Sequence, residues 1–161
     1  MTTKEAEDWG RFESTIDRFK FTKVKIKLVE GGQLPRKMTE GAAAYDCFAR
    51  TAEVNYSELQ LKIKLGFCLE LPHGYCAKVI PRSSIVNTNL RLSNCIGLID
   101  CDYRGEVSAI FDLYGVEPDA YKKGDRVCQM LIERLPDIEL VEVDTLSETK
   151  RGTGGYGHTG K

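Results

Sequence analysis

Two short stretches of this sequence place chemically useful side chains at the ends of apolar runs. In "GLIDCDYRGEV" (97–107) an apolar run leads into two carboxylates, Asp100 and Asp102, followed by Tyr103 and a turn. "PRSS" (81–84) breaks a strand-like run with a proline and then offers a guanidinium and two hydroxyls. A positioned carboxylate is a candidate general base, and guanidinium groups donate hydrogen bonds to anions.

Two further stretches have the same character. "AAAYDCFA" (42–49) sets Asp46 among small and aromatic residues, and "GDRVCQMLIERL" (124–135) carries Arg126 and Gln129 where a strand begins. Each stretch alone also has a plain structural interpretation, as a turn, a loop, a hairpin or an ion pair at a strand end. A functional interpretation therefore requires that several of these stretches contribute to one site.

The C-terminal stretch "RGTGGYGHTGK" (151–161) is rich in glycine and begins with Arg151. It matches two nucleotide-binding patterns, G-x-G-x-x-G and G-x-x-x-x-G-K, which both lead a strand into a helix whose N-terminus receives phosphate. No helix follows Lys161 in this sequence, so we expect neither motif. Glycines instead allow positive φ and close approach of backbone N–H groups to phosphate.

Composition excludes several classes of protein. With 161 residues, 42% hydrophobic, 29% charged and a formal net charge of −1, the chain is expected to be one globular domain without electrostatically driven binding to nucleic acid or membrane. No apolar run reaches the roughly 18 residues of a membrane span, and the charged N-terminus is not a secretory signal. Six scattered cysteines without C-x-x-C, and two histidines, favour reduced thiols over a zinc site, in a cytoplasmic or nuclear protein.

Most of the chain alternates with the period of a β-strand. "KVKIKLV" (23–29) puts Val24, Ile26 and Leu28 on one face, and "LQLKIKL" (59–65) puts four apolar side chains inward, beginning with Leu59. Further strand-like runs cover 67–71, 75–80, 95–99, 107–114, 126–135 and 138–143, with turn signals between them. Many short strands at this spacing predict an all-β antiparallel sandwich or barrel.

Three regions follow from this pattern. Residues 1–22 form an N-terminal extension in which the spacing of Trp9, Phe12, Ile16 and Phe19 predicts a short amphipathic helix. We expect this segment to dock on its own domain or to be a loose extension, and the alternative is that it binds an unknown partner. Residues 23–144 form the β domain, and 145–161 form a glycine-rich C-terminal arm.

Taken together and in order, the five stretches resemble the motifs of the trimeric dUTPase family, over about residues 24–161. The resemblance implies a jelly-roll-like β domain that forms a homotrimer with three active sites, each drawing motifs from all three subunits. The arm would then close over a neighbouring subunit's site. The implied reaction is hydrolysis of dUTP to dUMP and pyrophosphate, which keeps uracil out of DNA and supplies dUMP for thymidylate synthesis.

The resemblance also assigns the reaction's chemistry. Asp100 matches the general base that directs a water at the α-phosphorus, whereas Asp102 is expected to be structural. The expected cofactor is Mg²⁺, bound through the substrate, with Asp46 holding metal-bound waters rather than the ion itself. The phosphate contacts fall to Arg82, Ser83, Ser84, Gln129, Arg151, His158 and Thr159, with Gly157 also contacting the substrate.

Base and sugar selection are implied for the hairpin around 97–107. This stretch is the third of the five motifs in chain order, and 42–49 is the first. The hairpin residues Asn94, Gly97, Leu98, Ile99 and Ser108 are expected to pair with uracil. Tyr103 would pack beneath the deoxyribose and exclude a 2′-hydroxyl, and Tyr156 would stack on uracil as the arm closes.

Three departures from the family pattern stand out. Tyr156 replaces the usual phenylalanine, His158 replaces the usual serine, and the first motif lacks the commoner glycine and leucine around its aspartate. Two alternatives remain: a dCTP deaminase-like enzyme of the same fold, or a nucleotide-sensing regulatory protein on this scaffold.

Overall fold

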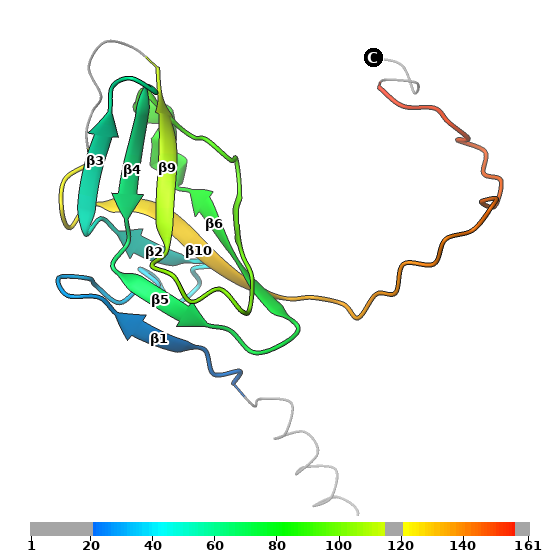
Figure 1. Ribbon diagram of the computed structural model, residues 1–161, viewed down its shortest axis with the longest axis horizontal. Coiled ribbons are helices and arrows are strands. Elements are labelled where there is room, and N and C mark those ends of the chain that lie inside the picture. Colours follow the sequence, from blue (N-terminus) through cyan, green and yellow to red (C-terminus); the bar gives the residue numbers. More distant parts are fainter. Residues whose placement is uncertain (1–20, 115–120, 157–161) are drawn as a thin grey trace, which may run out of the picture.

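The computed structural model describes residues 21–114 and 121–156, and this part of the chain is built almost wholly of β-strands (Figure 1). Its strands are β1 (Lys25–Leu28), β2 (Tyr45–Phe48), β3 (Thr51–Asn55), β4 (Gln60–Lys64), β5 (Phe67–Glu70), β6 (Tyr75–Pro81), β7 (Leu90–Leu92), β8 (Gly97–Ile99), β9 (Ser108–Leu113) and β10 (Arg126–Arg134). A short 3₁₀ helix, η2 (Ser83–Asn87), follows β6. In the described ranges no helix is long and apolar enough to cross a membrane.

The strands form three antiparallel sheets. Two have four strands each, in the orders β2-β10-β6-β8 and β3-β4-β9-β7, and β1 pairs with β5 in a small third sheet. The two larger sheets enclose the core, as the sequence predicted for a sandwich. The all-β antiparallel class is therefore confirmed.

The core follows the period of two along β4 and β5. Leu61, Ile63, Leu65 and Phe67 are completely buried, and Phe111 of β9 joins them from the neighbouring strand. Burying each of these side chains stabilises the fold by about 1.5–3 kcal/mol. This strong one-sided pattern is why these strands were readable from the sequence.

Two predicted inward positions are wrong. Leu59 has φ +50° and is 58% exposed, because it ends the turn between β3 and β4 instead of continuing the strand. Leu28 is 46% exposed, because β1 pairs only with β5 at the margin of the domain. The sequence analysis also missed the short strands β3 and β7 and the helix η2.

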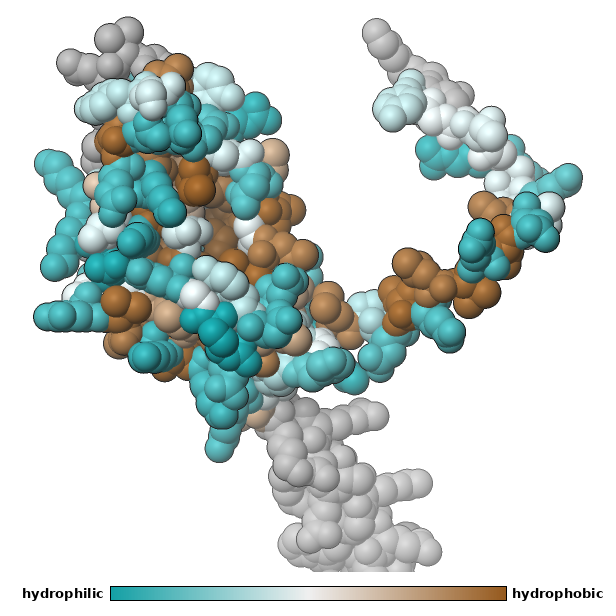
Figure 2. Space-filling model, viewed as in Figure 1, coloured by the Kyte–Doolittle hydropathy of each residue, from teal (hydrophilic) through white to brown (hydrophobic). Residues whose placement is uncertain are grey.

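The predicted strand at 138–143 is absent. Just after β10, Leu135 N–H donates to the Gly74 carbonyl. The next residue, Pro136, has no N–H, so it cannot continue the hydrogen bonds of the strand. The chain then leaves the domain as an extended arm (Figure 1). Its apolar side chains lie uncovered, and Figure 2 shows them as a hydrophobic stripe on the arm: Ile138, Leu140, Val141, Val143 and Leu146.

Candidate active site

Asp46 is the only buried charged residue in the described part of the chain, with 4% of its surface exposed. Arg82 Nε donates to its Oδ1 at 3.1 Å, and Arg126 Nη1 donates to its Oδ2 at 3.4 Å. A buried carboxylate needs such partners, because an unpaired charge is costly to remove from water. The three side chains form what we call the acid–arginine cluster.

The sheet β2-β10-β6-β8 brings this cluster together from three motifs. Gln129 of β10 lies opposite Asp46 of β2 and opposite Ile80 of β6, so β6 delivers Arg82 just beyond its own last residue. Arg82 Nη1 also donates to Ser84 Oγ at 3.2 Å and to the Arg126 carbonyl at 3.0 Å. Four of the residues expected to bind phosphate or metal-bound water, Asp46, Arg82, Ser84 and Gln129, therefore lie near one another, with Ser83 exposed at the start of η2.

Arg126 was not predicted as a site residue. Its position at a strand start suggested an ion pair, and the structure shows this pair with the aspartate of the first motif, 80 residues away in sequence. No local pattern identifies a partner at that separation.

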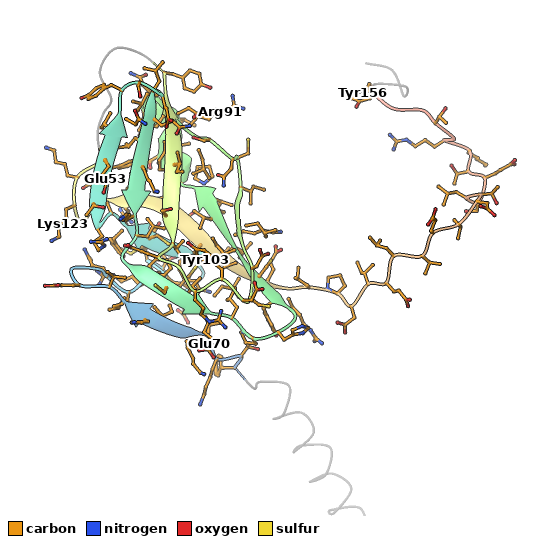
Figure 3. The ribbon with its side chains drawn as sticks, viewed as in Figure 1. Glu53, Glu70, Arg91, Tyr103, Lys123 and Tyr156 are labelled. Atoms are coloured by element: carbon orange, nitrogen blue, oxygen red, sulfur yellow. The ribbon has the colours of Figure 1, made fainter. Side chains whose placement is uncertain are left out.

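A hollow of about 220 Å³ lies in the third motif; Figure 3 labels Tyr103, one of its lining residues. Its lining contains the predicted Leu98, Ile99, Asp100, Tyr103 and Ser108, together with Val107, which the sequence analysis did not single out. Asp102 does not line it. The hollow is therefore formed by the residues expected to select the base and sugar, with the candidate base Asp100 among them.

The tyrosine of the hollow is held by its own turn. Tyr103 N–H donates to the Asp100 carbonyl at 3.2 Å, and its hydroxyl donates to the Glu106 carbonyl at 3.3 Å. A Cβ on Gly105 would lie 2.3 Å from that hydroxyl, so only glycine fits beneath the ring. Gly97 is similarly close to β6, since a Cβ there would lie 3.3 Å from Val79 Cβ.

The remaining predicted residues are dispersed. Asn94 is exposed in the turn before β8, and its amide nitrogen is within 3.4 Å of a Cβ built on Gly97. Arg151 and Tyr156 are exposed on the arm, and Figure 3 shows Tyr156 far from Tyr103. Gly157, His158 and Thr159, and the predicted N-terminal helix, lie outside the described residues.

The acid–arginine cluster and the hollow are separated within one chain. Asp46 of β2 and Ile80 of β6 both lie opposite the same residue of β10, so Asp46 is level with Ile80. On the other side of β6, Ile99 of β8 pairs with Ala77, and Asp100 follows Ile99. The offset is about four residues, or about 13 Å along the strands, and crossing from β2 to β8 adds about 14 Å. Along the sheet the two groups are thus about 20 Å apart, too far for both carboxylates to contact one water molecule.

Comparison with known proteins identifies the family. Residues 30–160 match the dUTPase family. The deoxyuridine 5′-triphosphate nucleotidohydrolase of Caldanaerobacter subterraneus subsp. tengcongensis is 40% identical over 144 residues, which cover 85% of this chain and 97% of that protein. That of Finegoldia magna is 37% identical over 141 residues, covering 86% and 99%. The chain belongs to the dUTPase family.

Solved dUTPase structures have the same fold. The dUTPase of Staphylococcus bacteriophage 80alpha, studied with dUPNHPP, superposes with a TM-score of 0.73 at 23% identity, covering 88% of this chain and all of that one. A dUTPase of S. aureus phage phi11, studied for its coordination of a structural Mg(II) ion, gives 0.66 at 20% identity, covering 76% and 97%. The jelly-roll-like all-β fold expected for a dUTPase is confirmed.

The side chains of this dUTPase offer few ligands for a metal ion. No group of three or more His, Cys, Asp or Glu side chains gathers within the described ranges. Both carboxylate oxygens of Asp46 already accept from guanidinium groups. The residues therefore do not form a cage around Mg²⁺, but they fit a water-mediated contact to an ion carried by phosphates.

Proposed function

We propose that this dUTPase hydrolyses dUTP to dUMP and pyrophosphate, and so keeps uracil out of DNA and supplies dUMP for thymidylate synthesis. The observation that carries the proposal is the hollow of the third motif, in which Asp100, Tyr103 and Ser108 share one lining. The named relatives act on this substrate, and their names supply the substrate class.

In the proposed mechanism Asp100 accepts the proton of the attacking water. Its side chain is exposed at the mouth of the hollow and has no hydrogen-bond partner among the described residues, so it can face solvent and substrate. Backbone groups of β8 and of Ser108 recognise the uracil edge, and the Tyr103 ring lies where a deoxyribose would pack. A general base of this kind contributes about 10²–10⁴ in rate.

Phosphate binding is proposed for Arg82, Ser83, Ser84 and Gln129, with Arg151 and the residues 157–159 added by the arm. Asp46 orients the Arg82 guanidinium through its 3.1 Å contact with Nε, and Nη1 donates to Ser84 and to the Arg126 carbonyl, which leaves Nη2 for phosphate. Mg²⁺, held to the protein through waters on Asp46, would supply charge neutralisation and a single conformer of the triphosphate.

A homotrimer with shared sites is proposed for two reasons. The separation of about 20 Å between Asp46 and Asp100 prevents one chain from placing both at one triphosphate. The arm also carries Tyr156 away from Tyr103 of its own chain (Figure 3), which supports closure of the arm over the hollow of a neighbouring chain.

Two lesser proposals complete the assignment. A cytoplasmic or nuclear location is supported by the six cysteines, which are all free. The N-terminal extension is proposed to dock on its own domain, with a partner-binding role as the alternative.

The decisive experiment compares pyrophosphate release from dUTP, dCTP, dTTP and UTP by the purified full chain with Mg²⁺. We expect turnover of dUTP at least about 100-fold above the other three, since a site built around one base edge leaves buried groups unpaired with another. Ammonia release from dCTP would instead identify a deaminase. Binding of dUTP without turnover would identify a nucleotide sensor.

A further inference from the structure

The walls of the hollow belong to different sheets. Leu98 and Ile99 lie on β8, which pairs with β6, whereas Ser108 begins β9, which pairs with β4. The segment 100–107 is the only covalent connection between these two walls. The width of the hollow therefore depends on how firmly this segment is attached to the rest of the domain.

Glu106 makes that attachment. Its carboxylate accepts hydrogen bonds from Arg50 Nε at 2.7 Å and Arg50 Nη2 at 2.9 Å, and also from Gly66 N–H at 3.0 Å. Arg50 lies between β2 and β3, and Gly66 lies between β4 and β5. Both side chains of the pair are about one-fifth exposed, at 20% and 19%. A bidentate arginine–carboxylate pair fixes orientation as well as distance.

The backbone at Gly66, which donates to Glu106, is closely packed. Gly66 has φ +77°, and its carbonyl accepts from Val29 N–H at 2.9 Å. Gly32 packs so closely against it that a Cβ at that position would lie 2.0 Å from the Gly66 oxygen. The backbone that holds the carboxylate therefore has no room to shift.

The backbone of Glu106 connects this ion pair to residues that line the hollow. Its carbonyl accepts the Tyr103 hydroxyl at 3.3 Å. The next residue, Val107, exchanges backbone bonds with the other side of the domain: its N–H donates to the Phe67 carbonyl, and its carbonyl accepts from Leu65 N–H. Tyr103 is thus held through the Glu106 carbonyl, and Ser108 lies two residues after Glu106, beyond Val107 with its own backbone bonds.

We propose that the Arg50–Glu106 pair is a positioning element that sets the width of the hollow and thereby the discrimination of deoxyribose from ribose. The inference rests on the proposed function, since it names the substrate of the same hollow. Neither side chain lines the hollow, so the pair acts through Tyr103 and Ser108. Loosening the tether lets the tyrosine ring withdraw and admits a 2′-hydroxyl.

The test measures kcat/KM for dUTP and for UTP in Glu106→Gln, Arg50→Met and the double variant. We expect the dUTP-to-UTP ratio to fall about 10- to 100-fold, because displacing a positioning group by about 1 Å costs this much. The change should appear mainly in KM for dUTP and in gained turnover of UTP. The double variant should be no worse than either single one, because each removes the same tether.

Matched controls separate positioning from general destabilisation. Glu58→Gln makes the same chemical change at the far end of the β3–β4 hairpin, where Glu58 accepts only from Asn55, and should leave the ratio unchanged. Val54→Ala weakens core packing without touching the hollow. Arg50→Lys keeps the charge but loses the bidentate fork, so it should fold and fall between the parent and Arg50→Met.

The outcomes are distinguishable. A dUTP-to-UTP ratio within twofold of the parent in Glu106→Gln and Arg50→Lys would overturn the inference, as would an equal loss in Val54→Ala at matched stability. If the parent releases no pyrophosphate from dUTP, the proposed function itself fails and this inference fails with it.

Discussion

Replacing Asp46 by asparagine tests the acid–arginine cluster, because the amide keeps the volume of the side chain and removes its charge. In the parent, a carboxylate that is only 4% exposed holds Arg82 at 3.1 Å and Arg126 at 3.4 Å. Asparagine retains an oxygen for Arg82 Nε. It leaves two neighbouring guanidinium groups without the negative charge between them.

The size of the effect follows from burial. Two unit charges about 4 Å apart attract by about 4 kcal/mol at an effective dielectric of about 20. Removing one member of a buried pair costs about 3–5 kcal/mol once desolvation is included. The Arg126 side chain is 41% exposed, so solvent screens its share. We therefore expect Asp46→Asn to lower the free energy of unfolding by about 2–3 kcal/mol, or about 5–10 °C in Tm.

The assay is urea unfolding at fixed chain concentration, because assembly contributes to apparent stability. Arg82→Met should cost more than Arg126→Met, since the Arg82 side chain is only 21% exposed. Glu58→Gln is the control for loss of one surface charge. An Asp46→Asn protein as stable as the parent to within about 0.5 kcal/mol would refute the reasoning that this cluster is a buried, mutually dependent unit.

Four further outcomes are expected. Asp100→Asn should lower kcat by at least about 100-fold while dUTP affinity stays within about tenfold, because the amide cannot accept the proton; turnover near the parent rate would remove the assignment of the base. Deleting residues 145–161 should leave a folded protein without turnover, and mixing it with Asp100→Asn chains should restore some activity; no recovery in any mixture would contradict shared sites. The hydrogen bond from Arg50 holds the pKa of Glu106 below its ordinary value. The stability that Glu106→Gln removes should therefore be present above about pH 4.3 and vanish as the pH falls through the lower pKa of the folded state. Urea titrations at several pH values would measure this loss. Exposed Cys95 should react with maleimide far faster than buried Cys128. The pKa of Cys128 is raised by its hydrogen bond to a neighbouring buried thiol and by burial, so its thiolate is scarce. Equal rates of labelling by mass spectrometry would contradict the burial of Cys128.

The sequence predicted strands well where one face is buried. The run 59–65 contains β4, whose inward residues are completely buried, and the run 126–135 contains β10. It missed β3 and β7, because β3 is mostly exposed and β7 has only three residues, so neither shows a clear alternation. The run 138–143 is rich in apolar residues, but it pairs with no strand within residues 21–114 and 121–156.

The site was predictable at the level of motifs and not of contacts. The lining of the hollow comes from one contiguous stretch, and its predicted members lie together. Two of the ion pairs join residues 80 and 56 positions apart, Asp46 with Arg126 and Arg50 with Glu106. Such pairings depend on strand order, which local periodicity does not contain.

The proposed homotrimer accounts for two features of this chain, one chemical and one of packing. On the chemical side, the separation of about 20 Å between Asp46 and Asp100 means that one chain cannot complete a site for one triphosphate. On the packing side, the arm exposes Leu140 at 94% and Leu146 at 87%, and the hydrophobic effect disfavours leaving such an apolar stripe in water. An arm that covers its apolar side chains on a neighbour also carries Tyr156 to that neighbour. In the proposed trimer, the contact that covers the apolar stripe would therefore also bring the Tyr156 ring to the neighbour's hollow.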